Sequence, residues 1–186
     1  TGVAARLVGG MTLHSILKLP VEKNGRTTGL AILTGNVLRT MRMQWKDIEF
    51  LLIDEISMVS YQVLCMIDSR LKQLKNNDEL FGGINVLLFG DLMQLPPIRA
   101  NQVFEQPTSM RAAIHLWRIF TLVELTQNMR QEGDTTFIDI LNALRVGELQ
   151  PHHMAVLISK VGNNFTGEFS IEKALRIRPH KKTVAA

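Results

Sequence analysis

The stretch "FLLIDEISMVS", residues 50–60, decides the fold class. Four apolar residues lead directly into two adjacent carboxylates, Asp54 and Glu55, as expected where a buried strand reaches the edge of a sheet. A second apolar run, "NVLLFGD" at residues 85–91, ends in the same way. Between the two runs, "SYQVLCMIDSRLKQL" carries apolar residues at helical spacing. Apolar strands that alternate with helices are typical of a parallel sheet covered on both faces, so we expect an α/β fold.

Other segments extend this pattern. A helix is predicted for "GNVLRTMRMQW", residues 35–45, and a third strand for "TLVEL", residues 121–125. The stretch "DTTFIDILNALRVG" predicts another helix, capped by Asp134 and ended by Gly147. We expect four apolar residues of this helix to point inward: Phe137, Ile138, Leu141 and Leu144.

Composition sets the outer limits. The chain has 186 residues and 46% are hydrophobic, enough for one sizeable core and a second small lobe. No apolar run approaches the ~18 residues that cross a bilayer, so we expect no membrane partner. Cys65 is the only cysteine, which excludes an internal disulfide and favours a reducing compartment. The net charge of +4 is compatible with nucleic acid but does not identify it.

The paired acids suggest phosphate chemistry. Ligands of parallel sheets bind outside the carboxyl ends of the strands, where Asp54 and Glu55 are expected. Asp54 can hold Mg²⁺ through water, and Glu55 can orient or deprotonate a water for attack on phosphorus. The alternative is that Asp54 caps the next helix and Glu55 is only solvated. From "DE" alone, the two interpretations are evenly balanced.

Two further residues follow predicted strand ends. In "FGDLMQLPPI", Gln94 lies three residues after the strand-end acid and can hydrogen-bond a γ-phosphate; the alternative is a bystander in a rigid turn. In "ELTQNMRQ", Arg130 follows the predicted third strand. An arginine aimed at a transferring phosphate is worth ~10³ to 10⁵ in rate. Taken singly, Arg130 is more simply a surface arginine.

Together these stretches resemble a known family. "TGVAARLVGGMTLHS", "LLIDEISMV", "IDSRLKQLKNNDELFGGINVLLFGDLMQLPP" and "LTQNMRQ" resemble consecutive motifs of the petite integration frequency (Pif) family of DNA helicases, a RecD-like, 5′-to-3′ branch of helicase superfamily one. The resemblance covers residues 1–147. It implies an α/β, RecA-like P-loop NTPase lobe, with a mainly parallel sheet flanked by helices, at residues 1–148. Residues 149–186 are then the connection to a second motor lobe and the start of that lobe.

The resemblance also implies roles for the nucleotide-site residues. The cofactors would be ATP and Mg²⁺. Asp54 and Glu55 would be the Walker-B pair, with Asp54 holding the metal and Glu55 acting in catalysis. Gln94 would sense the nucleotide, and Arg130 would contact the γ-phosphate.

The motif "TGVAA" with "MTLHS" resembles the family's grip on single-stranded DNA. The implied DNA-binding residues are Thr1, Gly2, Thr12, His14 and Ser15. Small hydroxyl donors and exposed amides suit phosphates, which receive most protein contacts to nucleic acid. For His14 the alternative is a helix-start histidine with a local hydrogen bond.

The sequence departs from the family pattern in one respect. No G-x-x-x-x-G-K-[ST] occurs, and in the family this loop precedes "TGVAA". The chain opens on Thr1, so we expect a segment of a longer protein, whose remaining motor motifs follow residue 186. Alone, the segment would bind ATP poorly and unwind nothing.

The whole protein is expected to act on single-stranded and forked DNA. By resemblance its roles lie in recombination, repair and telomere maintenance, inside the nucleus or mitochondrion if the source is eukaryotic, and its oligomeric state stays open. Two alternatives remain: a catalytically dead nucleic-acid-binding relic of a mobile element, and a P-loop ATPase that remodels proteins. His152 and His153 have no cysteine or acid at zinc spacing, so we interpret them as loop histidines.

Overall fold

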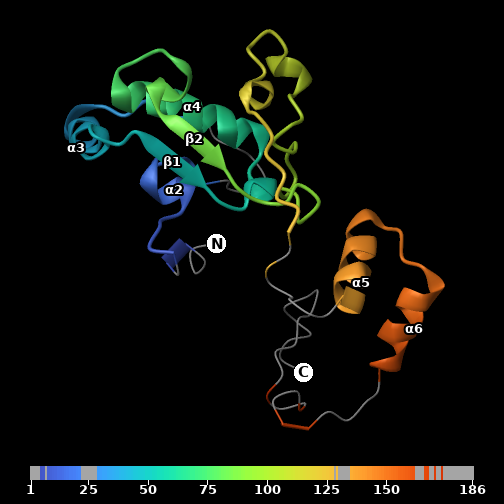
Figure 1. Cartoon of the computed structure of the whole chain (residues 1–186). Coiled ribbons are helices and arrows are strands. Elements are labelled where there is room, and N and C mark those ends of the chain that lie inside the picture. Colours follow the sequence, from blue (N-terminus) through green and yellow to red (C-terminus); the bar gives the residue numbers. More distant parts are fainter. Residues whose placement is uncertain are drawn as a thin grey trace. The chain divides into compact units, whose positions relative to one another are not determined.

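A computed structural model describes residues 5–6, 8–21, 29–127, 129, 135–161, 166–167, 170 and 173 (Figure 1). The chain forms two compact units, Thr1–Thr126 and Gln127–Ala186. A compact unit need not coincide with a motor lobe, so the predicted boundary at residues 148 and 149 stays a prediction. In the described part of the chain, no helix is both long enough and apolar enough to cross a membrane.

The first unit alternates helices and strands. Its main elements are α2 (Leu13–Ile16), α3 (Gly35–Trp45), β1 (Phe50–Ile53), α4 (Tyr61–Lys75) and β2 (Asn85–Leu88). Short turns of 3₁₀ helix join β1 to α4 and α4 to β2, and two more follow β2: η1 (Ile56–Met58), η2 (Leu80–Gly83), η3 (Thr108–Met110) and η4 (Leu116–Ile119). The second unit contains α5 (Thr135–Val146) and α6 (Pro151–Ser159).

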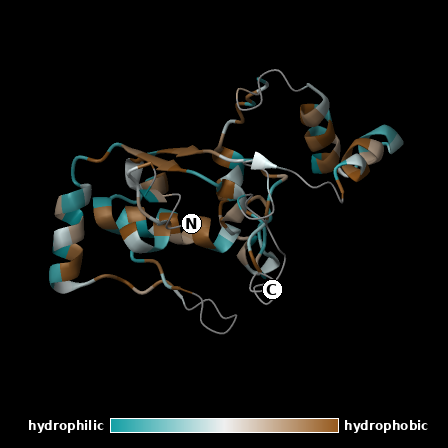
Figure 2. Cartoon of the chain, turned by 90° about the horizontal axis from the view of Figure 1, so that it is seen from below, coloured by the Kyte–Doolittle hydropathy of each residue, from teal (hydrophilic) through white to brown (hydrophobic). Residues whose placement is uncertain are grey.

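β1 and β2 form a parallel pair, which confirms both predicted strands (Figure 1). Apolar residues run along both strands (Figure 2). Leu51 and Ile53 of β1 are buried, whereas Phe50 is 56% exposed and Leu52 is 63% exposed. Within the described residues, one face of β1 is therefore covered and the other is largely exposed. Side chains alternate between the faces of a strand, and the described residues leave the Phe50 and Leu52 side chains largely uncovered.

The predicted third strand is also wrong. Residues 121–125 have no strand assignment, and no described segment pairs with them. Leu122, Val123 and Leu125 are each more than three-quarters exposed. Apolar content alone does not make a strand, because a strand needs a partner for its backbone hydrogen bonds.

The core forms around α4. Ser60 caps this helix by accepting a hydrogen bond from the Val63 amide, and the helix ends at Asn76 in the left-handed conformation. The buried residues on its apolar face include Leu64, Ile67, Leu71 and Leu74, and α3 adds Met41 and Trp45. The ammonium of Lys75 donates to three carbonyls at the end of α3, those of Trp45, Lys46 and Ile48. Both helices predicted for this part of the chain are confirmed.

A hydrogen bond and a close backbone contact hold the turn η2 against α4. The buried carboxylate of Asp68 accepts the amide of Phe81 at 2.7 Å and also pairs with Lys72. Gly82 has φ of +64°, and a Cβ there would lie 2.6 Å from the carbonyl oxygen of Leu71. The glycine is therefore required both by its backbone angle and by its contact with the helix.

In the second unit, α5 ends at Gly147, as predicted, where φ is +75°. The predicted cap Asp134 lies outside the described residues. The predicted inward face is largely wrong: Ile140 is the buried residue, whereas Phe137 is 42% exposed and Leu144 is 55% exposed. A helix face depends on what it packs against, and the neighbouring Asp139 hydrogen-bonds with α6.

Candidate functional site

Backbone hydrogen bonds join the carboxyl ends of β1 and β2. The amide of Phe89, just after β2, donates to the carbonyl of Ile53 at 2.8 Å. The amide of Ile56, just after the paired acids, donates back to the carbonyl of Phe89 at 3.0 Å. The loop that follows β1 and the loop that follows β2 therefore form one unit at the carboxyl edge of the sheet.

The paired acids lie exposed on the first loop. Oδ1 of Asp54 accepts the amide of Glu55 at 2.9 Å, and Glu55 adopts the left-handed conformation, with φ of +56°. The carboxylate of Glu55 makes no hydrogen bond or ion pair within the described residues. Because Ser60 caps α4, the alternative role of Asp54 as a cap for that helix is wrong. Both carboxylates are available to a ligand.

Gly90 makes the approach of the two loops possible. Its φ is +144°, and a Cβ there would lie 2.9 Å from the nitrogen of Ile56 and 3.4 Å from Cα of Glu55. The sequence alone does not indicate that the missing side chain at this position makes room for the acidic loop.

Gln94 lies on the second loop and is exposed. Its amide donates to the carbonyl of Asp91 at 2.9 Å, and its Nε2 lies 3.5 Å from Oδ2 of the same residue. The Asp91 carboxylate also accepts the amide of Met93. The structure therefore places Gln94 on the loop that is bonded to the acids. Arg130 lies outside the described residues.

Three of the predicted DNA-binding residues meet on α2. Oγ1 of Thr12 accepts the amide of Ser15 at 3.3 Å and so caps the helix. His14 and Ser15 are exposed. Thr1 and Gly2 lie outside the described residues. The hydroxyl proton of Thr12 and the side chains of His14 and Ser15 remain able to contact a phosphate.

A cavity of about 720 Å³ lies among α2, α3 and β1. Its lining includes Ser15, Lys18, Gln44, Trp45 and Phe50. The paired acids do not line it, and its walls are mostly apolar. The candidate nucleotide site is therefore the exposed edge of the sheet and not this cavity.

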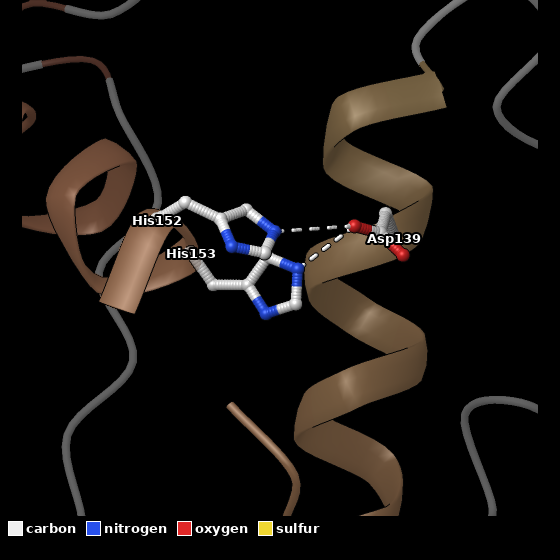
Figure 3. A group of neighbouring side chains, drawn as sticks. All are labelled: Asp139, His152 and His153. Atoms are coloured by element: carbon white, nitrogen blue, oxygen red, sulfur yellow. Dashed lines mark hydrogen bonds and ion pairs between the residues drawn. The ribbon is translucent and has the colours of Figure 1, made fainter. Parts of the chain in front are cut away.

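A separate polar cluster joins α5 to α6. Nε2 of His153 lies 2.8 Å from Oδ2 of Asp139, and Nε2 of His152 lies 3.8 Å from the same oxygen (Figure 3). The prediction that these are loop histidines is wrong, because both residues lie in the first turn of α6. Sequence spacing carried no signal for Asp139, which approaches only when the two helices pack.

The three ligand atoms are within 4.8 Å of one another, so the cluster could in principle hold a cation. Its hydrogen bonds argue against this. Nδ1 of the buried His153 accepts the amide of Gln150 at 3.1 Å, so the neutral ring carries its proton on Nε2 and donates it to Asp139. Nε2 could bind a metal only after its proton moved to Nδ1, against the amide. The hydrogen bond from His153, with both nearby imidazoles, lowers the pKa of Asp139.

Fold and geometry together define an α/β protein with exposed acids at the carboxyl edge of a parallel sheet, the edge at which such sheets commonly bind ligands. The family model of the PIF1-like helicases matches residues 1–154, and the chain belongs to that family.

Two curated relatives are named ATP-dependent DNA helicase PIF1. The one from Danio rerio is 34% identical over 99% of this chain, and the one from Saccharomyces cerevisiae strain YJM789 is 32% identical over 80% of it. The chain spans 28% of the first relative and 17% of the second.

The structure resembles solved Pif1 helicases. Bacteroides Pif1 in complex with ADP-AlF3 and ssDNA has a TM-score of 0.70 and 29% identity, covering 100% of this chain and 44% of that chain. A structure described as DNA unwinding at forked dsDNA by two coordinating Pif1 helicases has a TM-score of 0.67 and 32% identity, covering 86% of this chain and 39% of that chain. These similarities confirm the predicted fold class, a RecA-like α/β lobe with a parallel sheet.

Proposed function

We propose that the whole protein is an ATP-dependent DNA helicase that steps 5′ to 3′ along single-stranded DNA and opens the duplex at forks. The observation that carries this proposal is the pair of strand-end loops, bonded to each other, that present Asp54, Glu55 and Gln94 at one edge of the sheet. The chain's membership of the PIF1-like helicases supports it. Action on DNA would place the protein where DNA is, inside the cell.

Asp54 and Glu55 suit a site for Mg²⁺ and nucleotide. The second carboxylate oxygen of Asp54 makes no hydrogen bond or ion pair within the described residues, and carboxylate oxygen is a preferred ligand of Mg²⁺. Bound Mg²⁺ would neutralise charge on the nucleotide phosphates. The exposed carboxylate of Glu55 would orient the attacking water and accept its proton.

Gln94 would sense the nucleotide by a hydrogen bond to the γ-phosphate. The hydrogen bond that its backbone makes to Asp91 holds its loop, while the exposed carboxamide can still offer its oxygen and one N–H. The contact of Asp91 with the Gln94 side chain, at 3.5 Å, is long and would be exchanged for a phosphate contact at little cost. By family resemblance, Arg130 would add positive charge at the same phosphate.

DNA would lie across α2. The exposed side chains of His14 and Ser15 are there, and Thr12 starts the helix. Contacts of this kind go to the sugar-phosphate backbone and carry no base sequence. Binding that is independent of sequence is what a translocating motor needs. Roles in recombination, repair and telomere maintenance are part of the proposal, by resemblance.

Two other functions are tested by the same experiment. A helicase relic would bind DNA without turning over ATP, and a protein-remodelling ATPase would hydrolyse ATP without responding to DNA. Steady-state ATP hydrolysis by the whole protein, with and without a single-stranded oligonucleotide, separates all three. The proposal also requires strand separation of a duplex with a 5′ tail, with the matching 3′-tailed duplex left intact. Unwinding from the 3′ tail alone would overturn the assigned direction.

A further inference from the structure

Arg70 is a buried cation in the middle of α4, with 1% of its surface exposed. Arginine is rarely buried so fully without a carboxylate partner. Within the described residues its hydrogen bonds go only to uncharged oxygens. Burial lowers the pKa of the guanidinium, but an arginine remains charged at neutral pH. A charge held this way requires an explanation, because its desolvation is costly.

The hydrogen-bond partners of Arg70 explain why this charge is buried. Nε donates to the carbonyl of Leu17 at 3.0 Å, and Nη2 to that of Lys18 at 3.4 Å, both just after the last residue of α2. Nη2 also donates to the carbonyl of Ala31 at 2.9 Å. The carbonyls at a helix end have no partners within the helix, so they suit a charged donor. Arg70 therefore fixes the end of α2.

Apart from Arg70, the short helix α2 is held by Leu13 and Ile16, which pack against the core but are only half-buried. It contains four residues, none of them buried, and isolated helices of this length are not stable in water. Leu17, just beyond it, is fully buried in the core. The guanidinium and this leucine thus anchor α2 at one end. At its other end are Thr12, His14 and Ser15.

The helix that carries Arg70, α4, is also connected along the chain to the loop with Asp54 and Glu55. α4 begins right after η1, the turn that follows Glu55, and Arg70 lies ten residues beyond its cap Ser60. At ~1.5 Å per residue that is about 15 Å along one rigid rod. The acidic loop and the end of α2 are therefore attached to one helix.

We infer that Arg70 is a positioning residue that holds α2 ready for single-stranded DNA and links it, through α4, to the nucleotide site. The DNA part of this inference rests on the proposed function. Without the guanidinium, α2 would adopt its binding conformation only part of the time. A conformation populated one-tenth of the time weakens the apparent affinity about tenfold.

Arg42 provides a matched control. Its guanidinium also donates to uncharged oxygens of α4, the carbonyl of Gln73 at 3.0 and 3.1 Å and Oδ1 of Asn76 at 3.0 Å. It joins α3 to the end of α4, and within the described residues it makes no hydrogen bond to α2. Loss of Arg42 reports the effect of loosening α4 in general.

The test compares Arg70→Lys, Arg70→Met and Arg42→Met in the whole protein. Four quantities are measured: the Kd for a fluorescent oligo(dT), the Kd for ADP, ATP turnover with and without that DNA, and hydrogen exchange of the amides at residues 13–19. For both Arg70 variants we expect the DNA Kd to rise about tenfold, DNA stimulation of turnover to fall in parallel, and faster exchange at residues 13–19. ADP affinity and DNA-free turnover should stay within about twofold, and Arg42→Met should change none of these. Arg70→Lys keeps the charge and most of the packing, so it remains informative if Arg70→Met does not fold.

Three results would overturn the inference. Unchanged DNA affinity in both Arg70 variants is one, and an equal loss in Arg42→Met is another. A fall in ADP affinity as large as the fall in DNA affinity is the third, since it would mean that the whole lobe had loosened. If the wild-type protein binds no single-stranded DNA, the proposed function fails instead. Exchange at residues 13–19 then still decides whether Arg70 positions α2.

Discussion

Replacing Gly90 with alanine tests how closely the two strand-end loops must approach. A Cβ at this position would lie 2.9 Å from the nitrogen of Ile56, about 0.5 Å inside the 3.4 Å at which ordinary contacts begin. The neighbour is backbone that is itself hydrogen-bonded to Phe89, so the acidic loop must move. A displacement of ~1 Å in a catalytic group can cost ~10² in rate, so we expect a loss of about tenfold in ATP turnover at saturating DNA.

Gly35→Ala is the matched control for this variant. Gly35 also has positive φ, +58°, but a Cβ there would meet nothing within 4 Å. Both substitutions carry backbone strain of ~1–3 kcal/mol, and only Gly90→Ala pushes on the acids. The assay is steady-state turnover in the whole protein, with ADP affinity measured alongside. If Gly90→Ala turns over ATP as fast as Gly35→Ala, Gly90 does not set the position of Glu55.

Three further predictions concern stability and reactivity. Gly82→Ala should destabilise α4 by ~2–5 kcal/mol, because it adds backbone strain and a collision with the helix backbone; Gly35→Ala should cost ~1–3 kcal/mol. Hydrogen exchange of the α4 amides measures the effect of each substitution. Equal losses of stability in the two variants would refute the packing argument. Because the folded-state pKa of Asp139 is lowered by His153, its contribution is present above the unfolded pKa of ~3.9 and is lost as pH falls further. Proteolysis of the α5–α6 pair by an acid protease should therefore accelerate below about pH 4, and an equal acceleration in Asp139→Asn would contradict this. Burial raises the pKa of the Cys65 thiol to about 11, so alkylation of the native protein at pH 8 should be much slower than after unfolding; equal rates would show that the thiol is not protected.

The sequence was most informative where chemistry and periodicity coincide. The apolar runs before Asp54 and Asp91 predicted both strands, their parallel pairing and the shared edge at which both strands end in acids. Helical spacing predicted α3 and α4. The strand ends and the helical spacings depend on residues close together in the chain.

The errors concern features that depend on distant partners. Residues 121–125 have the composition of a strand, but pairing decides whether a strand forms. The pairing of Asp139 with His153 joins two helices, and neither spacing nor composition records how the helices cross. The role of Arg70 was equally hidden, since a charge in a helical sequence is usually solvated. Only the fold shows that the carbonyls of Leu17, Lys18 and Ala31 surround it.

The most direct test of the account is ATP turnover by the whole protein with Glu55 replaced by Gln. This change keeps the size of the side chain and removes the carboxylate that would orient and deprotonate water. We predict that DNA-stimulated turnover falls by ~10² to 10⁴, with affinity for single-stranded DNA unchanged, as expected for the loss of a general base. Turnover within a few-fold of wild type would contradict the account, because the exposed acid at the end of β1 would then have no part in hydrolysis.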